Sequence, residues 1–154
     1  MFSIHCGYPT ITEEERVVRN TTGAEVPELV PVLDAKEILE IQKLVRAMPV
    51  SDEVIRFAVK LVSRTRPEDP LAPPYVKEFV RWGASPRASQ YLVLGAKAVA
   101  AVNGKLCADY EGVRTVARQV LRHRILTNFN ARAQKMTVAN LIDKLLAEVR
   151  PDGK

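Results

Sequence analysis

A series of capped amphipathic segments constrains the fold of this chain more than any other feature of its sequence. Apolar residues recur three and four positions apart, which places them on one face of an α-helix. The segments with this spacing are 34–48, 51–65, 85–104, 109–125 and 137–149. Each begins with a residue that can cap a helix, in order Asp34, Ser51, Ser85, Asp109 and Thr137. Because strand signals are sparse, the pattern predicts a mostly α protein built as a helical bundle.

Two further signals place the ends of helices. Thr12 followed three residues later by Glu15 is a capping-box pattern and predicts an additional helix near the start of the chain. Gly104 is expected to close the helix that begins at Ser85, because glycine adopts the left-handed conformation readily.

Two segments carry the clearest candidate core stripes. In the first, the apolar positions are Ile38, Ile41, Leu44, Val45 and Met48. In the second, the predicted buried positions are Val54, Ile55, Ala58, Leu61, Val62 and Thr65. The segment 75–84 is ambiguous, and its one apolar face would contain Val76, Phe79 and Val80.

The first residues of the chain read as a strand. In "FSIHCGY", alternate positions are apolar, as in a strand with one buried face, but no comparable strand lies nearby. We therefore expect the chain to be a piece of a longer protein that supplies the missing strands. Residues 29–33, "LVPVL", follow a linker with Pro27 and could add one short edge strand.

Charge is spread unevenly along the 154 residues. Residues 1–77 have a net charge of −2 and residues 78–154 a net charge of +7. The second half therefore favours acidic partners or phosphates, although a solvated basic surface would give the same count. No apolar run is long enough to span a membrane and no signal peptide is visible. Cys6 and Cys107 form no metal or redox motif, so we expect a cytoplasmic protein.

Several catalytic signatures are missing from the sequence. It has no G-x-x-x-x-G-K-[ST] loop, no G-x-S-x-G elbow and no H-E-x-x-H pair. The two histidines, His5 and His123, stand far apart, and His5 next to Cys6 makes a poor metal site because neighbouring strand residues face opposite ways. The chain alone is therefore a poor candidate for a self-sufficient enzyme.

Arg87 is the first candidate for a functional residue. Ser85 can cap the helix and Pro86 suits its first turn, so Arg87 falls at about the second helical position. A cation there is disfavoured by about 0.3–1 kcal/mol, because the helix start already carries partial positive charge. A negative partner is expected, either a phosphate held by Arg87 with the free N–H groups or a nearby protein carboxylate.

A second basic feature is the spacing of Arg114, Arg118 and Arg122 along one helix, beside an apolar stripe. Such arginines could contact an acidic protein, nucleic-acid phosphates or only water. Aromatic residues do not interleave with this arginine stripe, which argues against nucleic acid.

The stretch from "FVRWGASPRASQYLVLGAKAVAAVNGK" to "DYEGVRTVARQVLRHRILTNF" resembles the C-terminal part of the MoxR family of AAA+ ATPases. "MFSIHCGYPTITEEERVV" is similar to that family's last core strand and following helix. The resemblance implies three regions: residues 1–24 as the end of the ATPase core, 25–50 as a linker with the first lid helix, and 51–154 as a helical lid domain. The expected fold is thus a helical lid with one strand left over from an α/β core and one or two short strands.

The same resemblance implies a function. Members hydrolyse ATP with Mg²⁺, form homo-oligomeric rings and act as chaperone-like machines, often with von Willebrand A domain proteins. The arginine of "GASPR", here Arg87, would be the sensor-2 residue that reaches the ATP phosphates, with Ser85 and Pro86 beside it. The phosphate loop and the metal-binding acids are absent from this chain, so it should neither bind ATP tightly nor hydrolyse it unaided. The alternative function is a helical binding module that docks an acidic protein or nucleic acid through the arginine stripe.

Overall fold

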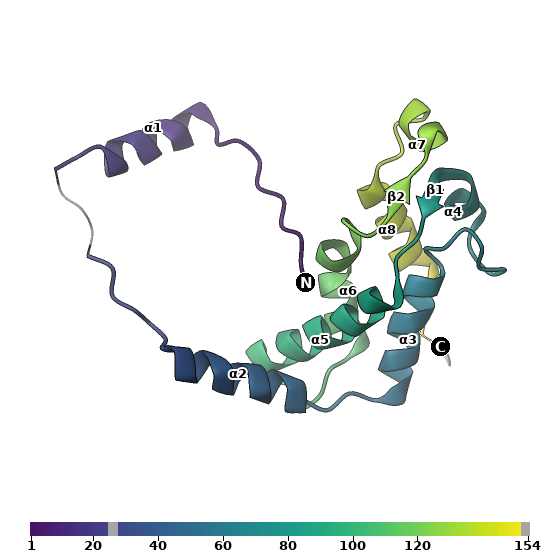
Figure 1. Ribbon diagram of the computed structural model, residues 1–154, viewed down its shortest axis with the longest axis horizontal. Coiled ribbons are helices and arrows are strands. Elements are labelled where there is room, and N and C mark those ends of the chain that lie inside the picture. Colours follow the sequence, from purple (N-terminus) through teal and green to yellow (C-terminus); the bar gives the residue numbers. More distant parts are fainter. Residues whose placement is uncertain (25–27, 152–154) are drawn as a thin grey trace.

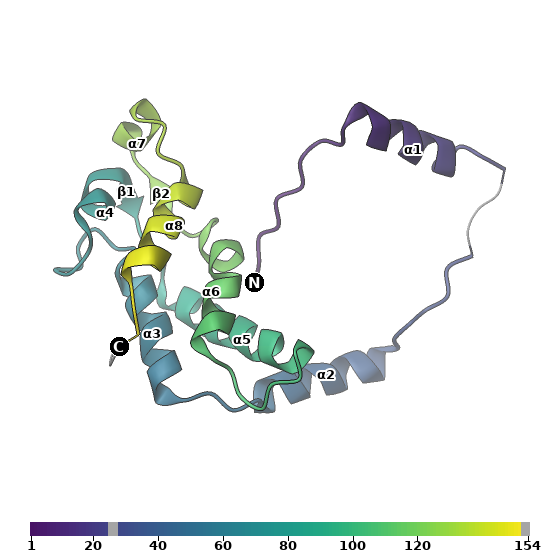
Figure 2. The same cartoon turned by 180° about the vertical axis from the view of Figure 1, so that it is seen from behind.

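The computed structural model describes residues 1–24 and 28–151 (Figure 1). Helices α3 to α8 gather into one body. Residues 1–24 and 28–34 form an arm in which α1 lies away from this body, as both views show (Figures 1 and 2). The elements are α1 (Ile11–Thr21), α2 (Ala35–Ala47), α3 (Asp52–Ser63), α4 (Pro74–Phe79), β1 (Val80–Trp82), α5 (Pro86–Val102), α6 (Tyr110–Leu121), β2 (Leu126–Thr127), α7 (Phe129–Ala133) and α8 (Val138–Glu148). The prediction of a mostly α fold with short strands is confirmed.

Helix α5 is the centre of the body. Its buried face is made of small residues and one leucine, spaced four apart: Ala88, Leu92, Ala96 and Ala100. Small side chains let a neighbouring backbone come close, and α6 packs against this face with Val113, Val116, Ala117 and Val120. Helix α3 contacts α5 on another side and contributes Phe57 and Leu61, both almost fully buried. These three helices hold most of the apolar core, and burial of their apolar surface is the main favourable term in folding.

A short antiparallel ribbon joins the segment after α4 to the segment after α6. β1 pairs with β2, with Val80 opposite Thr127 and Trp82 opposite Leu126. The ambiguous segment 75–84 thus divides into a short helix and a strand, and Val76, Phe79 and Val80 are buried as predicted. An isolated parallel bridge between Val50 and Ala108 joins the residues just before α3 to the residues just before α6.

The arm differs from the sequence-based expectation in three ways. Residues 2–8 form no strand, because a strand needs a hydrogen-bonded neighbour and the described residues offer only one backbone bond, from the Ser3 N–H to the Gln119 carbonyl at 2.9 Å. Residues 29–33 likewise form no edge strand. Pro27 lies outside the described residues.

The third difference is the start of α1. Thr10 rather than Thr12 caps it, and the Glu13 carboxylate accepts a hydrogen bond from the Thr10 N–H at 2.8 Å. The pairs Thr10–Glu13 and Thr12–Glu15 have the same spacing, so the pattern alone did not decide between them. The earlier pair gives the longer helix.

Helix α2 begins at its predicted cap, because Asp34 accepts a bond from the Glu37 N–H at 2.7 Å. Its predicted core stripe is wrong, however. Ile38, Ile41 and Leu44 are 45, 48 and 57% exposed, and only Val45 and Met48 are partly covered. The amphipathic pattern was correct, but α2 packs mainly on α5 within the described residues, and this contact leaves most of its apolar face exposed.

Three of the remaining predicted caps are confirmed, whereas Ser85 occupies the cap position of α5 without a side-chain bond to the helix. The side chains of Ser51, Asp109 and Thr137 each accept a backbone bond at the start of α3, α6 and α8. Gly104 has φ of +64° just beyond α5, as expected of a closing glycine. Within α3, Ile55 was predicted buried but is 37% exposed, and Phe57 takes the core position instead.

The first two helices, α1 and α2, lead to a prediction. Neither α1 nor α2 buries a residue fully, and an isolated helix of 11 residues is marginal in water. In the 154-residue chain, amide hydrogens of α1 should exchange almost as fast as in an unfolded peptide, while those of α5 and α6 should exchange only on global unfolding. Hydrogen exchange followed by mass spectrometry or NMR measures this. Equal protection of α1 and α6 would contradict the exposed position of α1.

Candidate functional site

Arg87 stands in the first turn of α5, and its side chain is exposed. Its guanidinium makes no hydrogen bond or ion pair with any described residue. Ser85 occupies the cap position, but its hydroxyl accepts no bond from the helix, and Pro86 fills the first helical position. The electropositive helix tip thus carries a cation with no carboxylate partner among residues 1–24 and 28–151.

The loop that leads to Arg87 is held at Ala84. The buried Thr65 hydroxyl accepts a bond from the Ala84 N–H at 2.8 Å and donates to the Val62 carbonyl at 2.6 Å. On the other side, the Arg66 Nε donates to the Ala84 carbonyl at 2.9 Å. Both backbone groups of Ala84 are therefore fixed by residues at the end of α3.

Gly83 lets this loop approach the end of α3. A Cβ at position 83 would lie 2.5 Å from the Thr65 carbonyl oxygen and 2.6 Å from the Arg66 Cα. No side chain fits in that space without moving one of the two backbones. The glycine of "WGASPR" is therefore required by a close approach rather than by an unusual φ angle.

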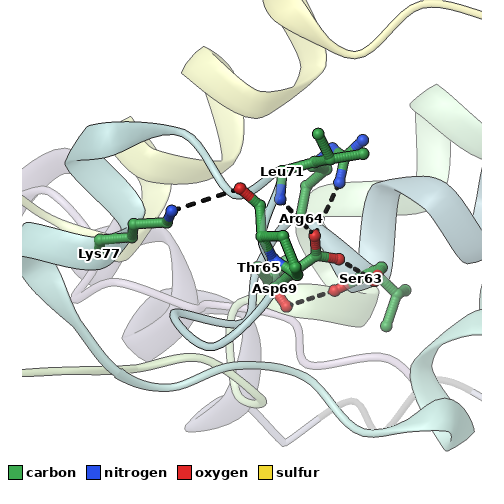
Figure 3. Close-up of polar contacts among 8 residues, drawn as sticks. Ser63, Arg64, Thr65, Asp69, Leu71 and Lys77 are labelled. Carbon is green, nitrogen blue, oxygen red and sulfur yellow. Dashed lines mark hydrogen bonds and ion pairs between the residues drawn. The ribbon is translucent and has the colours of Figure 1, made fainter.

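Beyond Thr65 and Arg66, the carboxylate of Asp69 holds the loop in place through three hydrogen bonds (Figure 3). It accepts bonds from the Ser63 hydroxyl, from the Arg64 Nη1 at 2.9 Å and from the Leu71 N–H at 2.8 Å. The Ser63 hydroxyl first, then the Leu71 N–H and the Arg64 cation, lower the pKa of Asp69 below its usual range. A depressed carboxyl pKa contributes stability at neutral pH that is lost as the pH falls through that lowered value.

Sequence reasoning missed this support for Arg87. Thr65 was predicted only as a buried position of an apolar stripe, and no role was predicted for Arg66 or Asp69. Asp69 two residues before Leu71 in a proline-rich stretch is the one signal that was available, since aspartate commonly accepts a bond from the N–H two residues on.

The arginine stripe is divided by the fold. Arg114 is half-buried, lies 5.5 Å from the centre of the Phe57 ring, and donates to the Leu146 and Val149 carbonyls at 2.6 and 3.3 Å. Arg118 forms an ion pair with Asp143 at 2.7 Å. Both therefore bind α8 within the chain, and the structure does not bring the three arginines together as one open surface. Arg122 is exposed.

The remaining candidates from the sequence form no catalytic group. His123 contacts Arg124, and partial desolvation, followed by the charge of Arg124, lowers the pKa of His123 below its usual value. Cys6 and Cys107 are both free and exposed. Within the described part of the chain, no three side chains gather that could hold a metal ion. The helices there are all too short or too polar to cross a bilayer.

Comparison with known proteins identifies the body. The AAA lid domain family matches residues 74–145, the span from α4 into α8. Over this span the chain is similar to an AAA lid domain. It is 31% identical over 149 residues to Chaperone MoxR1 of Mycobacterium tuberculosis, a match that covers 97% of this chain and 39% of that protein.

Two other comparisons extend over the same length. YeaC of Bacillus subtilis is 22% identical over 151 residues, covering 97% of this chain and 44% of YeaC. A crystal structure of a Cytophaga hutchinsonii protein assigned as an ATPase superposes with a TM-score of 0.88 at 26% identity, over 98% of this chain and 46% of that one. The chain thus spans less than half the length of each of these relatives.

The hydrogen bond between Thr65 and Ala84 gives a testable prediction. Thr65→Val removes the only side-chain acceptor of the buried Ala84 N–H and should lower the free energy of unfolding by about 1–3 kcal/mol. Thr65→Ser keeps the hydroxyl and should lose less, about 0.8 kcal/mol for one methyl group. Urea denaturation ranks the two variants, and amide exchange at Ala84 should be faster in the valine variant alone. A valine variant as stable as the parent would rule out the contact.

A second prediction concerns the stripe. Arg114→Ala should destabilise the lid by about 1.5–3 kcal/mol, because it removes charged hydrogen bonds to the end of α8. The matched variant Arg122→Ala truncates an exposed arginine of the same helix region and should change stability by less than about 0.5 kcal/mol. Equal effects in thermal or urea unfolding would mean that Arg114 does not fasten α8.

Proposed function

We propose that this lid works in an ATP-hydrolysing AAA+ protein and that Arg87 contacts the phosphates of ATP bound to the core of that protein. One observation carries the proposal: the exposed guanidinium of Arg87 has no partner among the described residues and stands at an electropositive helix start. The loop before this helix is fixed by hydrogen bonds to both backbone groups of Ala84. Such an arrangement is unfavourable by itself and becomes favourable when a polyanion binds.

The chemistry divides between the lid and the core. The core would hold ATP and Mg²⁺, since this chain contains no phosphate loop. Arg87 would stabilise the negative charge that spreads over the phosphate oxygens during hydrolysis. Ser85 and Pro86 would set the start of α5 so that the guanidinium points outward, and the Thr65 and Arg66 contacts would keep that direction constant. Because the same arginine binds nucleotide and belongs to the lid, ATP binding and lid position would be coupled.

The division of the chain follows from the same proposal. Residues 1–24 would belong to the ATPase core, residues 25–50 would connect it to the lid and supply the first lid helix, and residues 51–154 would form the lid domain. The exposed apolar faces of α1 and α2 support this division, because amphipathic helices normally cover a core.

The partners proposed for the complete protein follow from the MoxR relationship. They are its own ATPase core, neighbouring subunits of a homo-oligomeric ring, client proteins that it helps to assemble, and von Willebrand A domain proteins. The two free cysteines are compatible with a reducing, cytoplasmic location.

The test uses the complete ATPase that contains this lid. Arg87→Ala should reduce ATP hydrolysis by about 10²-fold or more, because it removes a preorganised positive charge from the transition state. Its melting temperature should stay unchanged, since Arg87 is exposed and unpaired among the described residues. Steady-state phosphate release and thermal unfolding measure the two quantities.

A matched control removes an exposed arginine elsewhere. Arg56→Ala on α3 should leave hydrolysis at the parental rate. Parental turnover in Arg87→Ala would refute the sensor role. A lower melting temperature together with slow turnover would assign Arg87 to the fold instead. The 154-residue chain alone should release no phosphate from ATP above the blank.

A further inference from the structure

A second exposed surface lies at the end of the body opposite α2, where β1, β2 and α7 meet (Figures 1 and 2). A hollow of about 450 Å³ opens there, lined by Arg81 from β1, Leu126 and Thr127 from β2, and Asn128, Phe129 and Arg132 around α7. We call this hollow, together with Trp82, the ribbon-tip surface. It does not contain Arg87.

The ribbon-tip surface exposes three large apolar side chains to water. Phe129 is 80% exposed, Trp82 59% and Leu126 52%. Trp82 and Leu126 stand opposite each other across the two strands, so they form one continuous apolar pair. Clustered exposed aromatic side chains on a folded protein are typical of an interaction site.

The exposure of β1 has a local cause. In a regular strand, neighbouring side chains point to opposite faces, and one of Arg81 and Trp82 would face the core. The pairing with β2 is irregular between Val80 and Trp82. Val80 is buried, whereas both residues after it face solvent. An irregularity of this kind redirects side chains, and here it turns a cation and an indole outward together.

Phe129 is exposed but firmly placed. The Asn128 side chain caps α7 through the Ala131 N–H at 3.1 Å and donates to the Glu78 carbonyl at 2.7 Å. The Asn128 N–H also donates to the Phe79 carbonyl at 2.9 Å. The residue before Phe129 is thus fixed to α4 at two points, so little conformational freedom would be lost when Phe129 enters a partner.

The charge of the surface selects the partner. Arg81 and Arg132 both line the hollow, neither guanidinium has a hydrogen bond or ion pair to any described residue, and no carboxylate lines the hollow. A guanidinium binds a carboxylate through two parallel hydrogen bonds. Two arginines around a leucine and a phenylalanine therefore match a segment in which acidic side chains flank an apolar one. Nucleic acid fits less well, because tight phosphate binding requires a longer run of cations.

We propose that the ribbon-tip surface docks an acidic protein segment that carries an apolar or aromatic anchor. The anchor would pack against Phe129, Leu126 and Trp82, and its flanking carboxylates would pair with Arg81 and Arg132. The proposal does not depend on nucleotide contact by Arg87.

The test uses Trp82, the only tryptophan in the sequence, as a built-in reporter. The 154-residue chain is titrated with a short synthetic peptide that alternates Asp and Glu with Leu and Phe, and Trp82 emission is recorded. Saturable change is expected, weakened at least about tenfold by Phe129→Ala, as for truncation of an interface anchor. Arg81→Glu with Arg132→Glu should abolish it.

Matched controls separate the site from general effects. Tyr8→Ala removes a fully exposed aromatic side chain from the arm, and Arg122→Glu reverses an exposed charge at the C-terminal end of α6; both should leave the titration unchanged. Arg87→Ala should also leave it unchanged, which distinguishes this surface from the proposed nucleotide contact. Circular dichroism of each variant checks that it folds.

Four results would overturn the proposal. They are no saturable change in Trp82 emission, an equal response to a peptide with Lys in place of the acids, tighter binding of single-stranded DNA than of the acidic peptide, and an emission change that follows the concentration of the chain itself. The last result would assign the surface to a second copy of the chain.

Discussion

The packing of α5 against α3 and α6 is the interaction on which the rest of the body depends. Ala88, Ala96 and Ala100 have small side chains, so the valine-rich face of α6 can pack close to this face of α5. Close packing gives each buried methyl group many neighbours, and a larger side chain on this face would force the helices apart. Helix α8 packs on α6, whereas α7 and the ribbon contact α4.

Much of this fold could be predicted from the sequence because it depends on interactions between residues that are close in the chain. Ser51, Asp109 and Thr137 cap their helices because each side-chain oxygen reaches a free N–H within its own first turn, which no distant residue can change. Gly104 takes its left-handed conformation for an equally local reason. The position of Arg87 in the first turn of α5 follows from Ser85 and Pro86, although its role as a phosphate contact stays a prediction.

What could not be read from the sequence depends on partners distant in the chain. The periodicity of α2 is correct, yet it does not state whether Ile38 and Leu44 are covered, because the covering surface belongs to other segments. The Thr65 hydroxyl binds Ala84, 19 residues away, and no spacing rule anticipates that bond. Likewise, Arg114 and Arg118 look alike on a helical projection, but the position of α8 alone determines that they bind its carbonyls and Asp143.

The rod-like form of α5 has a mechanical consequence. Its 17 residues extend about 26 Å, with Arg87 at one end, and α2 is fastened further along, where the Lys97 ammonium donates to the Arg46 carbonyl. Arg87 lies ten residues, or about 15 Å, from Lys97, so a tilt of about 5° at the α2 attachment would move it by about 1.3 Å, enough to lengthen a hydrogen bond beyond its normal range. Because α5 is packed on α3 and α6, a slight tilt of the whole body relative to α2 would carry the charged tip of α5 with it.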